Sequence, residues 1–169
     1  MNHSGGEAQI LLPTWVAIGA GRLALWRRPK LAVMSALASA GCDQVVTLLS
    51  EREHATSIGD VVQREGMKWT RLPLANGSPP IGDTKMMIVA ALSDLSHSLD
   101  FGTSMLLHCS AGIHRTGMVA YALLRWCRYT EGQSLDLIAA MRRVTREGMQ
   151  AKHIQWGNDV FAESQRVTS

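Results

Sequence analysis

Apolar residues along this chain gather in short unbroken runs that alternate with segments of helical periodicity. Gln44–Leu49 and Ser104–His108 each contain a continuous apolar run, as strands buried on both faces of a sheet do. Between them, Thr84–Leu99 repeats its apolar residues three and four positions apart, which is the pattern of one helix face. Helices that alternate with buried strands predict a single α/β domain of three layers, with a mostly parallel central sheet flanked by helices.

Turn and capping residues set the expected bounds of the elements. Strands are expected over Ile10–Ile18, Gln44–Leu49, Met67–Leu74 and Ser104–His108. Helices are expected over Leu31–Ala40, Ser57–Glu65, Thr84–Leu99, Thr116–Tyr129, Ser134–Glu147 and Gln155–Ser164. Residues 75–83 contain two glycines and two prolines, so we expect a surface loop there. Residues 1–8 are expected to be disordered, and residues 9–169 to form the one domain.

One glycine-rich segment invites a different interpretation. Gly19-Ala20-Gly21-Arg22-Leu23-Ala24 nearly matches the dinucleotide-binding fingerprint G-x-G-x-x-A. That fingerprint needs a long helix that begins at the glycines, and Pro29 interrupts the segment soon afterwards. We therefore expect a turn that leads out of the preceding strand, and no nicotinamide cofactor.

Composition narrows the class of protein. The 169 residues are 46% hydrophobic, which is enough to form the core of one folded domain, and the net charge of +3 is too weak to predict nucleic-acid binding. Three cysteines form no disulfide framework, and the first residues lack the regions of a signal peptide. No apolar run reaches the roughly 18 residues of a membrane span. A monomeric cytoplasmic protein without a membrane segment is expected.

The chemistry of the chain is concentrated in His108–Gly117, which follows a strand and opens a helix. Backbone N–H groups of such a loop converge on one point, where they can bind an anion. Cys109 lies among these dipoles with Arg115 six positions later, so its thiolate should be favoured and act as a nucleophile. The planar guanidinium of Arg115 can hold two oxygens of a phosphoryl group. Thr116 could stabilise the departing thiolate or cap the helix.

The run His-Cys-five residues-Arg-Thr resembles the signature of the cysteine-based protein tyrosine phosphatase superfamily. Residues 67–154 look like the catalytic half of small dual-specificity phosphatases. Within them, Leu72-Pro73-Leu74-Ala75-Asn76-Gly77 and Gly148-Met149-Gln150 are most similar to the kinase-associated phosphatase type. The resemblance implies a dual-specificity phosphatase-like fold and hydrolysis of phosphomonoesters, with a phosphorylated protein or peptide as substrate.

In such an enzyme Cys109 would attack the phosphorus, and Thr116 would assist its later departure. The cradle that binds the phosphoryl group would comprise Ser110, Ala111, Gly112, Ile113, His114 and Arg115. By the same resemblance, Gln150 could orient the attacking water, although it could also be a polar residue at the start of a helix. His108 is either an orienter of the cradle or a core histidine with one backbone partner. No metal or other cofactor is implied.

The loop of residues 75–83 departs from the family pattern. Where the family has an aspartic acid that protonates the leaving group, this chain has Asn76, which has no proton to give at neutral pH. Asp83 is the nearest carboxyl, and it could be the proton donor or the N-cap of the next helix. If Asp83 is not the acid, weak activity biased toward aryl phosphates is expected.

Two other functions use the same cradle. A catalytically weak module that only binds phosphate groups would fit Asn76. A phosphatase of a non-protein substrate, such as an RNA 5′ end or an inositol phosphate, is the other alternative. A phosphatase of lipids would be expected to carry lysines in the loop after Cys109, and the loop has none.

Overall fold

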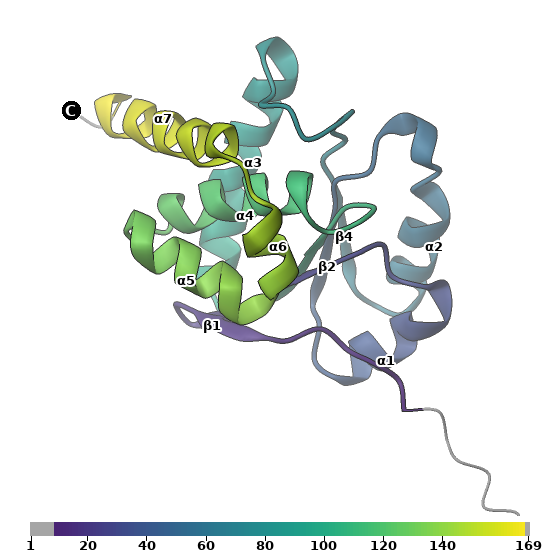
Figure 1. Ribbon diagram of the computed structural model, residues 1–169. Helices are drawn as coiled ribbons and strands as arrows, with labels where there is room; N and C mark the ends of the chain where they lie inside the picture. The colour runs from purple at the N-terminus through teal and green to yellow at the C-terminus, as the bar shows by residue number, and fades with distance from the viewer. Residues whose placement is uncertain (1–8, 168–169) are drawn as a thin grey trace, which may run out of the picture.

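The structure is a computed structural model that describes residues 9–167. Its centre is a five-stranded sheet in the order β1-β2-β5-β3-β4 (Figure 1). The strands are β1 (Val16–Ile18), β2 (Gly21–Trp26), β3 (Gln44–Thr47), β4 (Lys68–Arg71) and β5 (Ser104–His108). All neighbours pair in parallel except β1, which is antiparallel to β2 at the edge. The expected disorder of residues 1–8 concerns residues outside those described.

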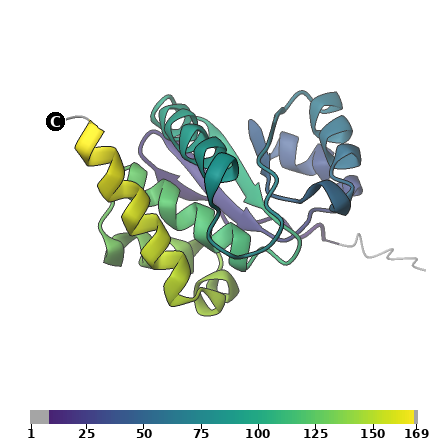
Figure 2. The ribbon, with the colours of Figure 1, turned by 90° about the horizontal axis from the view of Figure 1, so that it is seen from above.

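Helices cover both faces of this sheet (Figure 2). The first face carries α1 (Met34–Ser39) and α2 (Thr56–Arg64). The second face carries α3 (Gly82–Asp100), α4 (His114–Trp126), α5 (Glu131–Met141), α6 (Arg143–Gly148) and α7 (Ala151–Val167). Two short 3-10 helices, η1 (Leu31–Val33) and η2 (Glu51–Glu53), precede α1 and α2. The expected three-layer α/β domain, with a mostly parallel sheet, is confirmed.

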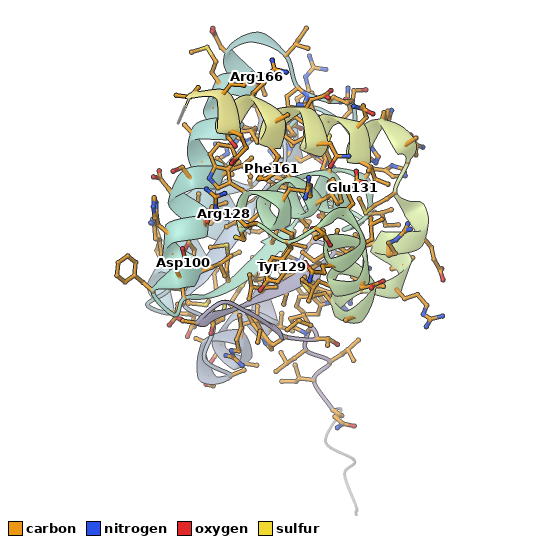
Figure 3. All side chains as sticks on the ribbon, turned by 90° about the vertical axis from the view of Figure 1, so that its left-hand side faces the viewer. Asp100, Arg128, Tyr129, Glu131, Phe161 and Arg166 are labelled. Carbon is orange, nitrogen blue, oxygen red and sulfur yellow. The ribbon has the colours of Figure 1, made fainter. Side chains whose placement is uncertain are left out.

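Helix α4 is the buried element against which the second face packs. Every residue from Thr116 to Leu124 is buried, because α4 lies between the sheet and α7. Polar contacts join the outer side of α4 to α7: the Tyr121 hydroxyl donates to Asn158 Oδ1 at 2.8 Å, and the Arg125 guanidinium lies 4.4 Å from the centre of the Phe161 ring. Figure 3 shows this side, with Phe161 on α7 and Glu131 at the start of α5. The middle and last turns of α4 are therefore held against α7.

The turn expected at Gly19 is much shorter than predicted. Only Gly19 and Ala20 separate β1 from β2, and Gly21–Trp26 is a strand that pairs with the central strand β5. The strand is buried at all but one of its six residues, so burial in the sheet outweighs the local turn preference of the two glycines. This strand occupies the place of the crossover helix that a dinucleotide-binding fingerprint would need.

Two capping assignments and one helix also differ from the expected ones. The N-cap of α3 is Ile81, so Asp83 lies inside the first turn and the interpretation of Asp83 as an N-cap is wrong. Helix α4 begins at His114 after Ile113, so Thr116 does not cap it. The helix expected over Ser134–Glu147 is two helices, because Arg142 has an extended backbone between α5 and α6.

None of the helices within residues 9–167 combines the length and apolar character that crossing a membrane requires.

Candidate active site

The loop from Cys109 to Ile113 joins the carboxyl end of β5 to the first turn of α4. The Cys109 side chain is 2% exposed, and the Gly112 N–H donates to its sulfur over 3.2 Å. Gly112 has a positive φ of 70°, and a Cβ there would collide with the Trp26 carbonyl oxygen. Glycine is therefore required at this position for both conformation and space. The Arg28 N–H donates to the Ser110 carbonyl at 2.8 Å, which fixes the loop to the end of β2.

Arg115 is held by a carboxylate on the neighbouring strand's loop. Its Nη1 and Nη2 donate to Glu53 Oε2 and Oε1 at 2.6 and 2.9 Å, and Nη1 also donates to the Leu74 carbonyl at 3.1 Å. The hydrogen bonds from Arg115 lower the pKa of Glu53 to about 2. Glu53 is consequently ionised at neutral pH and has no proton to give. In return, the pKa of Arg115 is raised, first by Glu53 and further by its attraction to Cys109.

Sequence reasoning assigned Glu53 no role. The residue ends η2, where its Oε2 also accepts a hydrogen bond from the Ser50 N–H at 2.7 Å. Its pairing with Arg115 follows from the sheet order, since β3 and β5 are neighbours and both carry loops at their carboxyl ends. The only feature of the sequence that pointed to Glu53 as a site residue was its position as a carboxylate just after a buried strand.

His108 lies beneath the cradle in a chain of buried hydrogen bonds. Its Nδ1 is 3.1 Å from the Cys109 carbonyl oxygen, and its Nε2 is 2.8 Å from Thr47 Oγ1. A carbonyl only accepts, so Nδ1 carries the proton and Nε2 accepts from the Thr47 hydroxyl. Trp69 Nε1 in turn donates to Thr47 Oγ1 at 2.9 Å. Burial lowers the pKa of His108 to about 4, so the ring is neutral at physiological pH.

The Thr116 hydroxyl is fully buried and makes no hydrogen bond within the described part of the chain. A buried hydroxyl without a partner is costly, at about 1–3 kcal/mol. Such a group is available to a ligand or reaction intermediate in the cradle.

A cleft of about 840 Å³ lies between η2 and the segment that follows β4. Asn76 lines this cleft, and its Oδ1 accepts from the Ser78 N–H at 2.9 Å, which makes a local turn. Glu51 and Arg52 line the opposite side. Asp83 is exposed in the first turn of α3 and is not among the residues that line the cleft.

Gln150 immediately precedes α7, and its side chain is exposed. Its backbone N–H donates to His153 Nδ1 at 3.1 Å, while His153 Nε2 donates to the Gly77 carbonyl at 2.7 Å. Burial lowers the pKa of His153, which favours this neutral ring. The ring centre is 5.7 Å from that of His114, which lies exposed on the cradle. His153, which sequence reasoning missed, therefore joins the Asn76 loop to the start of α7 beside the cradle.

The chain was compared with known proteins. Residues 14–160 match the family model described as the Swiss Army Knife protein DSP-PTPase phosphatase domain. No curated protein matched the chain.

Among solved structures, the chain is similar to kinase-associated phosphatase carrying a substitution of its catalytic-site cysteine by serine, with 18% identity and a TM-score of 0.71 over 96% of this chain and 99% of that one. It is similar to Tk-PTP in its active form, with 19% identity and a TM-score of 0.70 over 90% of this chain and 99% of that one. It is also similar to human DUSP28, with 15% identity and a TM-score of 0.68 over 92% and 100%.

At these identities the structural likenesses show the fold, which agrees with the family model that spans most of the chain. The chain belongs to the DSP-PTPase phosphatase domain family, as a small dual-specificity phosphatase of the cysteine-based protein tyrosine phosphatase superfamily.

Proposed function

We propose that the chain hydrolyses phosphomonoesters on phosphorylated proteins or peptides through a phosphocysteine on Cys109. The proposal rests on three features that lie together around the Cys109 sulfur. The Gly112 N–H points at the Cys109 sulfur, the loop lies at the N-terminus of a rigid helix, and Arg115 is held beside the sulfur by Glu53. Together they form a site for a nucleophilic thiolate and a phosphoryl group.

The geometry of Arg115 favours phosphoryl binding. A guanidinium has five N–H groups. Glu53 and Leu74 use both hydrogens of Nη1 and one of Nη2. This leaves Nε–H and the second Nη2–H, which lie side by side on one edge and match two oxygens of a phosphoryl group. Glu53 therefore orients the guanidinium while leaving that edge for the substrate.

In the first step, the Cys109 thiolate attacks phosphorus, and the bond from phosphorus to the leaving oxygen breaks. In the second step, water attacks the phosphocysteine, the sulfur leaves as a thiolate, and phosphate is released. Arg115 and the N–H groups of the cradle residues, Ser110, Ala111, Gly112, Ile113 and His114, hold the phosphoryl oxygens in both steps. We assign the buried Thr116 hydroxyl, which is unpaired among the described residues, to donation to the departing thiolate, and Gln150 to the attacking water. His108 orients the cradle through the Cys109 carbonyl.

The leaving group decides which substrates react well. Asn76 occupies the position where the family has its acid, and it cannot protonate a leaving oxygen. A tyrosine leaving group needs little protonation, whereas a serine or threonine alkoxide needs it. We therefore assign phosphotyrosine as the preferred substrate, with slower reaction of phosphoserine and phosphothreonine.

A monomer in a reducing compartment such as the cytoplasm fits the free cysteines Cys42, Cys109 and Cys127.

The test compares wild type with Cys109→Ser on an aryl phosphate and a phosphotyrosine peptide. We expect the variant to lose hydrolysis, because serine at neutral pH is a far weaker nucleophile than a thiolate, and to retain peptide binding. Binding by wild type without any turnover would instead favour the second candidate, a phosphate-binding module, for which Asn76 is the specific observation. Turnover of an RNA 5′ end or an inositol phosphate in preference to the peptide would assign a non-protein substrate.

A further inference from the structure

The carbonyl side of the cradle is held by two residues, Arg142 and Thr145, to which sequence reasoning assigned no role. Arg142 Nη1 donates to the carbonyl oxygens of Ala111 and Gly112 at 3.1 and 2.8 Å. The Thr145 hydroxyl donates to the same Gly112 oxygen at 2.5 Å, and Thr145 is fully buried. Arg142 also donates to Thr145 Oγ1 at 3.2 Å, so the pair acts as one unit.

These carbonyls belong to peptide groups whose N–H groups the proposed function assigns to the phosphoryl cradle. The Ala111 carbonyl shares its peptide with the Gly112 N–H, which donates to the Cys109 sulfur. The Gly112 carbonyl shares its peptide with the Ile113 N–H. A peptide whose carbonyl accepts a hydrogen bond from a cation becomes a stronger donor at its N–H, since hydrogen bonds in a chain polarise one another.

The surrounding packing keeps this contact in place. Helix α6 lies beside the start of α4 (Figure 1). A Cβ at Gly148 would collide with the Ile113 side chain, and one at Gly117 would lie 2.7 Å from Met149 Cγ. Arg142 has no carboxylate partner among residues 9–167. Burial and the nearby Arg27 lower the pKa of Arg142, whereas Cys109 acts in the opposite direction.

We propose that Arg142 and Thr145 are positioning residues that orient and polarise the cradle peptides, and so stabilise the Cys109 thiolate and the bound phosphoryl group. The proposal rests on the function proposed above, in which Cys109 is the nucleophile. It predicts that loss of the Arg142 charge acts on the sulfur without any contact between Arg142 and the substrate.

The test uses Arg142→Met, Arg142→Lys and Thr145→Val, with Arg143→Met as the matched control. Arg143 is the exposed neighbour at the start of α6, so its replacement removes the same charge without touching the cradle. Two quantities are measured in the full chain: the pH profile of Cys109 alkylation by iodoacetamide, and kcat and KM for p-nitrophenyl phosphate. Thermal unfolding checks that each variant is folded.

We expect Arg142→Met to move the acid limb of the alkylation profile to higher pH and to lower kcat/KM about tenfold, the equivalent of one charge-assisted hydrogen bond. Arg142→Lys should give an intermediate shift, because it keeps the charge but not the two-carbonyl contact. Thr145→Val should shift the alkylation profile in the same direction. It tests the positioning role of the Arg142–Thr145 pair if Arg142→Met does not fold. Arg143→Met should match wild type.

An alkylation profile of folded Arg142→Met or Thr145→Val that superimposes on that of wild type would overturn the proposal. The alkylation measurement needs no turnover. If wild type hydrolyses nothing but the Arg142 and Thr145 variants still shift the alkylation profile, the proposed function is contradicted. The role of Arg142 and Thr145 as positioning residues is then still supported.

Discussion

At the scale of single residues, the proposed function gives Glu53 the role of orienting Arg115 toward a phosphoryl group. The two side chains form a bidentate pair in which Glu53 is 28% exposed and Arg115 is 12% exposed. A bidentate contact fixes the plane of the guanidinium as well as its position. Without it, Arg115 would keep its charge but lose its orientation.

We predict that Glu53→Gln lowers kcat/KM for an aryl phosphate roughly tenfold to a hundredfold, because small misplacements of a positioned group are costly. Steady-state kinetics checks this, with Glu65→Gln as the control. Glu65 is the exposed C-cap residue of α2 and does not line the cleft. Equal losses in the two variants would contradict the assigned role of Glu53.

The same pair gives a pH dependence of stability. The pKa of Glu53 is lowered from 4.5 to about 2 in the folded chain, so the unfolded chain takes up this proton first. Its contribution to the free energy of unfolding is therefore complete above pH 4.5 and is lost as the pH falls toward 2. Denaturant unfolding across this range should show a steeper loss for wild type than for Glu53→Gln.

At the scale of elements, the proposed function assigns the choice of leaving group to the segment between β4 and α3. It carries Asn76 at the cleft, and His153 fixes it through the Gly77 carbonyl. Asp83 lies beyond it in the first turn of α3, outside the residues that line the cleft. Asn76 therefore lines the cleft, and so does Leu74, whose carbonyl accepts a hydrogen bond from Arg115.

We therefore predict that Asn76→Asp raises the turnover of alkyl phosphates by up to about 10²-fold, the typical effect of a general acid, and raises that of aryl phosphates much less. Asp83→Ala should leave both rates near those of wild type. Comparing the two substrate classes in the two variants checks this. Unchanged rates in Asn76→Asp together with a collapse in Asp83→Ala would assign the acid to Asp83.

Elements also show where sequence reasoning fails. The strands β3 and β5 were predictable because their apolar runs are unbroken and bounded by polar residues. Strand β2 was missed because two glycines and a nearby proline suggested a turn, while its pairing with β5 depends on residues about 80 positions away. The break at Arg142 was missed because the helical periodicity continues across it.

At the scale of the whole molecule, the family signature predicts a nucleophile, Cys109, and a phosphate clamp, Arg115, from residues only six positions apart. Their supports come from distant parts of the chain: Glu53 after β3, Trp26 at the end of β2, and Arg142 between two helices. Such contacts follow from topology, and no local pattern in the sequence contains them. The fold class was therefore accessible from the sequence, and the surroundings of the site were not.

The central claim of this account is that Cys109 becomes covalently phosphorylated during turnover. Its most direct measurement is acid quenching of wild type during hydrolysis of an aryl phosphate, followed by mass spectrometry of its peptides. The account predicts a phosphoryl group on the Cys109 peptide that disappears as substrate is exhausted and never forms in Cys109→Ser. Continued turnover with Cys109 unmodified at every time point, or with the phosphoryl group on another residue, would contradict it.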